Sequence, residues 1–166
     1  MSRIEAVEPI VHGRARCYSQ DNLDEAFFGV HERIVLARGN IAGAQWTGVA
    51  TGVALSWLES RAVDAVIVAG SADDAFGSPV PILCRSPEDV LQGRRVKPSL
   101  CPSLAVLDAV ADDPTIRRLL FCGVGCAVQA LRRIGTRSGQ TVEQSLGLDQ
   151  DGLFVLGTHC ADNSPT

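Results

Sequence analysis

Two cysteines in this chain stand where a thiolate could do chemistry. Cys126 follows the apolar run of residues 119–122 after a glycine-containing turn, at the head of a segment with helical spacing. Cys160 follows a second apolar run, residues 153–156, after a Gly-Thr-His turn. A helix N-terminus stabilises thiolate, and the carboxyl ends of buried strands line the ligand crevice of an open α/β sheet. The pair indicates a redox cofactor or a metal cluster, with a structural thiol as the alternative for Cys126.

The turn before Cys126 also carries part of a dinucleotide-binding pattern. Gly123 and Gly125 between a strand and a helix would let backbone amides approach a pyrophosphate, but position 128 is Val where the pattern has a third glycine. A plain tight turn is the alternative interpretation. His159, beside Cys160, could serve metal ligation or acid–base work, although a histidine in a turn is usually just solvated.

A polar and aromatic segment precedes the first convincing helix. Gln45, Trp46, Thr47 and Gly48 offer donors and an aromatic face that suit a flavin or a phosphate, and a helix cap is the alternative. Among the remaining cysteines, Cys122 lies inside an apolar run, which favours a small buried side chain.

The elements that must position these residues follow one another as helix and strand. This order predicts an α/β domain with an open, mostly parallel sheet, flanking helices and an irregular N-terminal arm. We place the arm at residues 1–42 and the domain at residues 43–166, with residues 135–150 as a polar surface excursion. Strands are expected at residues 63–70, 117–122 and 153–156, with a second short apolar piece at residues 81–84. Helices are expected from a start at residues 45–48 to about residue 60, and at residues 86–91, 104–111 and 126–134. The helix at residue 86 has the capping signature Ser-Pro-Glu-Asp.

Composition excludes several classes of function. The chain has 166 residues, 46% of them hydrophobic, which suits one domain with its own core. Its formal net charge of -4 gives no electrostatic footprint for nucleic acid. No apolar run approaches the roughly 18 residues of a membrane span, and the first residues carry no recognisable targeting segment. Its six cysteines are expected to be thiols or ligands rather than a disulfide framework.

Five motifs in order resemble one protein family. They are GAQWTG at residues 43–48, SPEDVL at 86–91, VKPSL at 96–100, LLFCGVGCAVQALR at 119–132 and VLGTHCADN at 155–163. This set resembles the coenzyme F-420 hydrogenase/dehydrogenase beta-subunit family, above all its plant and cyanobacterial branch. The resemblance implies FAD, 4Fe-4S clusters, electrons from reduced ferredoxin and reduction of a chlorophyll-type tetrapyrrole, either 7-hydroxymethyl chlorophyll a or divinyl chlorophyllide.

The resemblance also suggests roles for individual residues. The expected flavin contacts lie at the start of the first helix, Lys97 is a candidate for an anionic group of the flavin or substrate, and the two turn cysteines are cluster ligands or neighbours. The residues concerned are Gln45, Trp46, Thr47, Gly48, Thr51 and Lys97 for the cofactor and Cys126 and Cys160 for the metal. Cys17, Cys84 and Cys101 match no family motif.

The chain matches only the amino-terminal part of the family pattern. A 4Fe-4S cluster normally takes four thiolates, and the two turn cysteines supply two. We therefore expect part of a ferredoxin-dependent iron–sulfur flavoprotein reductase that binds FAD weakly by itself and completes a cluster only with outside residues. The alternatives are a truncated, non-catalytic or partner-dependent module, completed by a second polypeptide or assembled as a homo-oligomer, and an electron-transfer subunit for coenzyme F-420. The resemblance implies a chloroplast or the cyanobacterial cytoplasm.

Overall fold

A computed structural model describes residues 31, 33–45, 48–95, 97, 99–134 and 139–160 of the chain. The chain divides into two compact units, residues 1–37 and 38–166. In the first unit the described residues have no regular secondary structure. The helices and strands below all lie in the second unit. The domain boundary between residues 42 and 43 stays a prediction.

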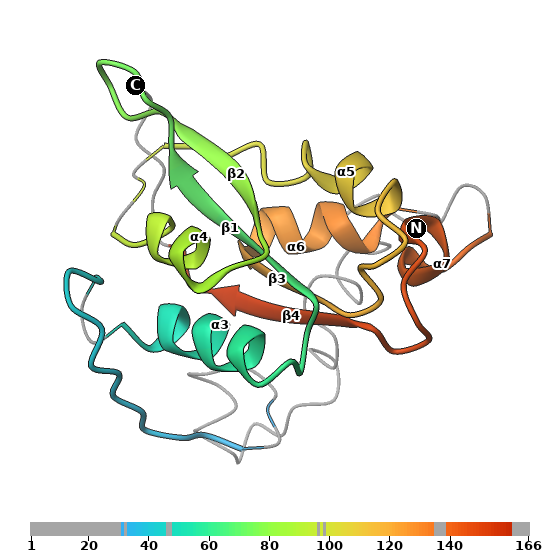
Figure 1. Cartoon of the computed structure of the whole chain (residues 1–166), viewed down its shortest axis with the longest axis horizontal. Coiled ribbons are helices and arrows are strands. Elements are labelled where there is room, and N and C mark those ends of the chain that lie inside the picture. Colours follow the sequence, from blue (N-terminus) through green and yellow to red (C-terminus); the bar gives the residue numbers. More distant parts are fainter. Residues whose placement is uncertain are drawn as a thin grey trace, which may run out of the picture. The chain divides into compact units, whose positions relative to one another are not determined.

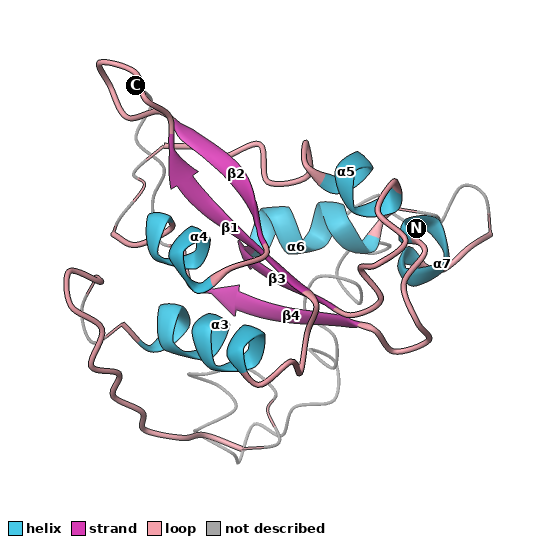
Figure 2. Cartoon of the chain, viewed as in Figure 1, coloured by secondary structure: helices cyan, strands magenta, loops and turns pink. Residues whose placement is uncertain are grey.

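The second unit is built on a sheet whose four strands have the order β2-β1-β3-β4 in the part of the chain described. Its strands are β1 (Ala65–Ser71), β2 (Pro79–Cys84), β3 (Leu119–Val124) and β4 (Leu153–Thr158). β1 pairs antiparallel with β2 and parallel with β3, and β3 pairs parallel with β4 (Figure 2). The predicted α/β fold with a mostly parallel sheet is therefore confirmed.

Helices cover both faces of this sheet (Figure 1). One face packs against α3 (Val49–Glu59) and α4 (Pro87–Gln92), and the other against α5 (Leu107–Ala111), α6 (Gly125–Arg132) and α7 (Val142–Leu146). Successive residues of a strand point to opposite faces, and both sets are buried in β1 and β3. In the sequence, these strands therefore appear as continuous apolar runs and not as alternating apolar and polar residues.

Each face has its own apolar cluster. Phe121 is fully buried at the centre of the cluster under α5, α6 and α7. On the opposite face, Trp57 of α3 meets Phe154 of β4 edge to face, with ring centroids 5.1 Å apart and an interplanar angle of 86°. Trp57 is partly buried and packs against the apolar cluster of this face.

The predicted capping signature forms at the start of α4. The Ser86 hydroxyl accepts the Asp89 N–H, while Asp89 Oδ2 accepts the backbone N–H groups of Arg85 and Ser86, each at 3.1 Å. The hydrogen bonds with Ser86, above all with its side chain, and with Arg85 lower the pKa of Asp89. They outweigh burial, which raises it. Pro87 occupies the first turn, where its missing N–H leaves no helical bond unmade.

The prediction of a polar surface excursion at residues 135–150 is wrong for its second half. α7 begins with a capping box between Thr141 and Gln144, and it ends at Gly147 in the left-handed conformation. Leu146 and Leu148 are buried in the core under α7. The Thr-x-x-Gln signature was present in the sequence, but a segment with only two buried leucines shows no helical periodicity.

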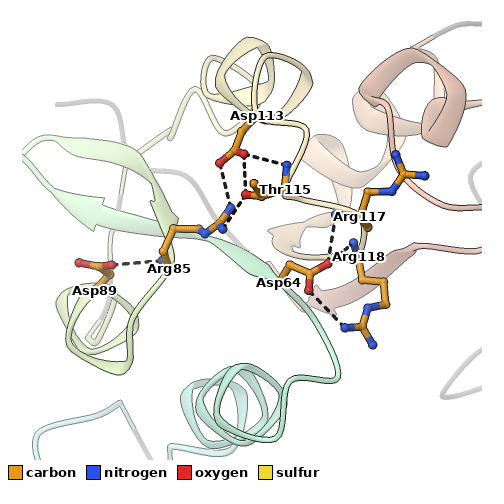
Figure 3. Close-up of polar contacts among 7 residues, drawn as sticks. All are labelled: Asp64, Arg85, Asp89, Asp113, Thr115, Arg117 and Arg118. Atoms are coloured by element: carbon orange, nitrogen blue, oxygen red, sulfur yellow. Dashed lines mark hydrogen bonds and ion pairs between the residues drawn. The ribbon is translucent and has the colours of Figure 1, made fainter.

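A single carboxylate joins the residues that directly precede β1 and β3 (Figure 3). Asp64 Oδ2 accepts the backbone N–H groups of Arg117 at 3.0 Å and Arg118 at 2.8 Å, and Oδ1 accepts the Arg118 guanidinium at 3.2 Å. The Asp64 N–H in turn donates to the Arg118 carbonyl at 2.8 Å. These contacts occupy residues 117 and 118, so β3 begins at Leu119, two residues later than predicted.

Leu146→Ala tests whether α7 belongs to the core. Removing a buried leucine side chain leaves a cavity, so the variant should lose about 2–4 kcal/mol of unfolding free energy in urea denaturation. Leu100→Ala, at a leucine that is 68% exposed, should lose less than about 0.5 kcal/mol. Equal losses in the two variants would contradict the placement of Leu146.

Asp64→Asn tests the carboxylate at the start of β1. Burial raises the pKa of Asp64, but bonds from the backbone and side chain of Arg118 and from Arg117 outweigh it, and the net pKa lies below the usual 3.8. A lowered folded pKa stabilises the fold above about pH 3.8, and that stabilisation disappears as the pH falls through the folded value. Asp64→Asn should therefore cost about 1–3 kcal/mol at pH 7 and progressively less in acid.

Asp73→Asn is the matched control, because Asp73 is an exposed carboxylate in the loop after β1. It should leave the urea midpoint at pH 7 unchanged. A loss for Asp64→Asn that stays constant from pH 7 to pH 2 would contradict the role given to its charge.

Candidate functional site

The structure brings the two predicted metal-binding cysteines to one edge of the sheet. β3 and β4 stay paired as far as Val124 and Thr158, and Cys126 and Cys160 each lie two residues beyond that pair. Both cysteines are exposed. Since β1, β3 and β4 are parallel, this is the carboxyl edge, where open α/β sheets bind their ligands. In Figure 1 these strands point to the left side of the view, where α3 also begins.

The described residues do not supply a complete metal site. They contain no group of three His, Cys, Asp or Glu side chains that could hold a metal ion. Cys126 lies in the first turn of α6, whose N-terminus has no side-chain cap, and His159 is exposed beside Cys160. Two thiolates do not fit a 4Fe-4S cluster, which normally needs four.

The glycines before Cys126 have different structural roles. A Cβ at Gly123 would lie 2.5 Å from the Phe121 ring, so the buried phenylalanine requires glycine there. A Cβ at Gly125 would meet nothing within 4 Å, and the same is true at Gly157 in β4. Packing in the core therefore accounts for the first glycine of the dinucleotide-like pattern.

The predicted cofactor segment leads into α3 through a tight turn. Gly48 is the N-cap residue with φ of +72°, and a Cβ there would lie 2.9 Å from the Ile41 Cβ and 3.0 Å from the Ala44 Cβ. Among the described residues, no side chain caps the helix. Gln45 is exposed and Thr51 is half-buried, whereas Trp46 and Thr47 lie outside the described residues. The structure therefore presents a helix N-terminus whose first amides face no capping side chain, an arrangement that suits an anionic or carbonyl oxygen.

A basic loop after α4 contacts Ala42, the residue just before the GAQWTG motif. Arg94 Nη1 donates to the Ala42 carbonyl at 2.8 Å, and Arg94 Nε donates to the Leu91 carbonyl at 2.7 Å. Lys97 is half-buried and donates to the backbone carbonyls of Arg94 and Arg95. Burial, followed by the charge of Arg95, lowers the pKa of Lys97. The sequence indicated Lys97 but not Arg94, whose contact with a residue 52 positions away leaves no local signal.

Residues 34–108 match the family described as coenzyme F420 hydrogenase/dehydrogenase, beta subunit N-term. The chain is 46% identical, over 98% of its length, to the chloroplastic 7-hydroxymethyl chlorophyll a reductase of Oryza sativa subsp. japonica. It is 42% identical, over 97% of its length, to an uncharacterized protein of Nostoc sp.. The chain belongs to the coenzyme F420 hydrogenase/dehydrogenase beta-subunit family.

The family fold is also found in a solved structure. A chain of the F420-reducing NiFe hydrogenase complex from Methanosarcina barkeri superposes with a TM-score of 0.58 and 26% identity, covering 69% of this chain and 38% of that one. The chain spans 32% of the rice reductase and 38% of the Nostoc protein, so it corresponds to about a third of the length of these two relatives. No helix among the described residues has the length and apolar character needed to cross a bilayer.

Two further cysteines of this family member are core residues. Cys84 is fully buried, and Cys122 is half-buried and packs on the same face of the sheet. Burial, with the charges of Asp89 and Cys122 as smaller causes, raises the pKa of Cys84 to about 12. Burial alone raises the pKa of Cys122 to about 12. The interpretation of Cys122 as a small apolar side chain is supported, and neither thiol is suited to ligation.

Thiol alkylation separates the exposed edge from the core. At pH 8, a thiol with a pKa of about 12 rather than 9.0 has about a thousandfold smaller thiolate fraction, and burial slows reagent access further. Iodoacetamide followed by peptide mass spectrometry should therefore modify Cys126 and leave Cys84 and Cys122 unmodified. Full modification of both core cysteines in urea is the positive control. Reaction of Cys84 at the rate of Cys126 in the native chain would contradict the structure.

Proposed function

We propose that this chain is the flavin-associated part of a ferredoxin-dependent iron–sulfur flavoprotein reductase that acts on a chlorophyll-type tetrapyrrole. The observation that carries the proposal is the site around the start of α3, where a helix N-terminus without a side-chain cap among the described residues follows a turn that Arg94 of the basic loop binds at the Ala42 carbonyl. The 46% identity to a reductase of 7-hydroxymethyl chlorophyll a favours a tetrapyrrole as the substrate. Divinyl chlorophyllide is the other substrate that we propose.

FAD suits the residues at this site. Gln45, Trp46, Thr47, Gly48 and Thr51 would hold it, with Lys97 near an anionic group. FAD, when bound, supplies the exchange between single electrons and the two-electron reduction of the substrate. The chain's own contribution is orientation: backbone N–H groups at the start of α3 would donate hydrogen bonds, and Gly48, packed against Ile41 and Ala44 in the left-handed conformation, fixes the turn from which that helix starts.

Electrons would arrive at the carboxyl edge of the sheet. We propose reduced ferredoxin as the donor, and Cys126 and Cys160 as thiolates that contribute to a 4Fe-4S cluster together with residues outside the described part of the chain. The described residues do not fit a complete cluster. The chloroplastic rice relative favours a chloroplast or a cyanobacterial cytoplasm as the location.

A second candidate function is electron transfer to coenzyme F420 as a subunit of a larger complex. The similarity to a chain of the F420-reducing hydrogenase complex favours it, at 26% identity. In that case the chain would depend on partner subunits for its redox groups. Both candidates place a flavin at the same site, so FAD binding tests what they share.

FAD titration of the purified chain, followed by flavin absorbance and fluorescence, tests the proposed site. We expect saturable, one-to-one binding in the wild type. Gly48→Ala should weaken it by about tenfold or more, equal to about 1.4 kcal/mol, since a Cβ there would press on Ile41 and Ala44. Gly147→Ala is the matched control, because Gly147 also has a positive φ, +70°, but its Cβ would meet nothing within 4 Å.

Both glycine variants carry similar backbone strain, so a difference between them isolates the clash at α3. Gly147→Ala should therefore bind FAD within twofold of the wild type. A wild-type chain whose absorbance and fluorescence show no FAD binding would defeat the flavin proposal for this chain.

A further inference from the structure

Arg94 connects two segments that are 52 residues apart in the sequence. Its Nη1 donates to the Ala42 carbonyl at 2.8 Å and its Nε to the Leu91 carbonyl at 2.7 Å. The Nε bond to Leu91 is partly buried, whereas the Nη1 bond to Ala42 is exposed to solvent. Two nitrogens of one planar guanidinium are engaged at once, which fixes the orientation of the group as well as its position.

The segment that Arg94 holds is folded against Gly48, the N-cap residue of α3. The Ala44 N–H donates to the Ile41 carbonyl at 3.2 Å, and the Gly48 N–H donates to the Gln45 carbonyl at 3.0 Å. The Ile41 Cβ lies 2.9 Å from where a Cβ of Gly48 would be. Holding Ala42 therefore also holds Ile41 against the helix start, and it fixes the turn that carries Gln45.

The loop that carries Arg94 is held from its other side. Lys97 Nζ donates to the carbonyls of Arg94 and Arg95. Arg95 has a φ of +74°, which folds the loop tightly enough for one ammonium to reach both oxygens. Lys97 thus fixes the backbone of Arg94, and Arg94 in turn fixes the cofactor segment.

We propose that Arg94 is a positioning residue for the flavin site. Its guanidinium holds Ala42, and with it the turns formed by residues 41–45 and Gly48, in the arrangement that offers Gln45 and the amides of α3 to FAD, and it couples this segment to the loop of Lys97. The inference rests on the proposed function for its ligand. The hold on the segment itself is a property of the chain without any ligand.

Amide hydrogen exchange of the full chain without FAD tests that hold. Arg94→Gln removes both bonds, so the amides of Ala44 and Gly48, which donate to carbonyls within this segment, should exchange about tenfold faster. Arg85→Gln is the matched control: Arg85 also bridges distant segments, with Nη1 bound to Asp113 and Nη2 to Thr115, each at 3.0 Å (Figure 3). Arg85→Gln also loses a long-range contact, but it should leave the exchange of the Ala44 and Gly48 amides unchanged.

FAD binding then tests the positioning role. Arg94→Gln should raise the FAD dissociation constant about tenfold and change the visible circular dichroism of the flavin at saturating FAD, whereas Arg85→Gln should change neither. Arg94→Lys keeps the charge, but its single nitrogen cannot replace both Nε and Nη1, so this variant should restore neither the affinity nor the spectrum.

The outcomes separate this inference from the proposed function. Unchanged exchange of the Ala44 and Gly48 amides in Arg94→Gln overturns the inference whether or not FAD binds. Faster exchange with wild-type affinity and dichroism reduces Arg94 to a structural contact and also overturns it, as does full rescue by Arg94→Lys. A wild-type chain that binds no FAD defeats the proposed function, and the exchange rates alone then decide whether Arg94 holds the segment.

Discussion

The register of the parallel strands depends on the carboxylate of Asp64. It accepts the backbone N–H groups of Arg117 and Arg118, the two residues that lead into β3, and so fixes β3 beside β1 before the ladder begins. Arg117 extends the connection to the next strand, because its guanidinium binds Asp149 in the turn that leads into β4. A one-residue slip of either strand would exchange its two buried faces, so these polar contacts protect the whole core.

The two edges of the sheet consequently have different chemistry. At the amino edge, charged side chains are engaged with backbone groups and with one another, and they serve the fold. At the carboxyl edge, Gly123 and Gly157 are the next-to-last residues of β3 and β4, and the exposed Cys126 and Cys160 follow two residues beyond the last pair. Backbone without side chains allows close approach of a ligand, and exposed thiols can become ligands. Stabilising the sheet from one edge leaves the other edge available for function.

Much of this arrangement could be predicted from local sequence. Buried parallel strands appear as short apolar runs, and the Ser-Pro-Glu-Asp cap of α4 is a local signal, so both were predicted correctly. α7 was missed because its amphipathic pattern is too short to see. Arg94 was missed for a different reason: its partner, Ala42, contributes a backbone carbonyl, which no residue type reveals. The placement of Cys126 and Cys160 at one edge followed from the strand pattern, whereas their use as ligands stays a prediction.

Cys126 and Cys160 lie the same number of residues beyond the last strand pair, so the effect of an insertion or deletion on this match depends on where in the chain it falls. The connection from α6 to β4 returns the chain to the amino edge before β4 begins, so residues gained or lost there leave the Val124–Thr158 pair intact. A single residue inserted between Thr158 and Cys160 would break the match at once. Insertions around residue 139 therefore leave the match between the two cysteines intact. The two residues that separate each cysteine from its strand, by contrast, must keep their number to preserve it.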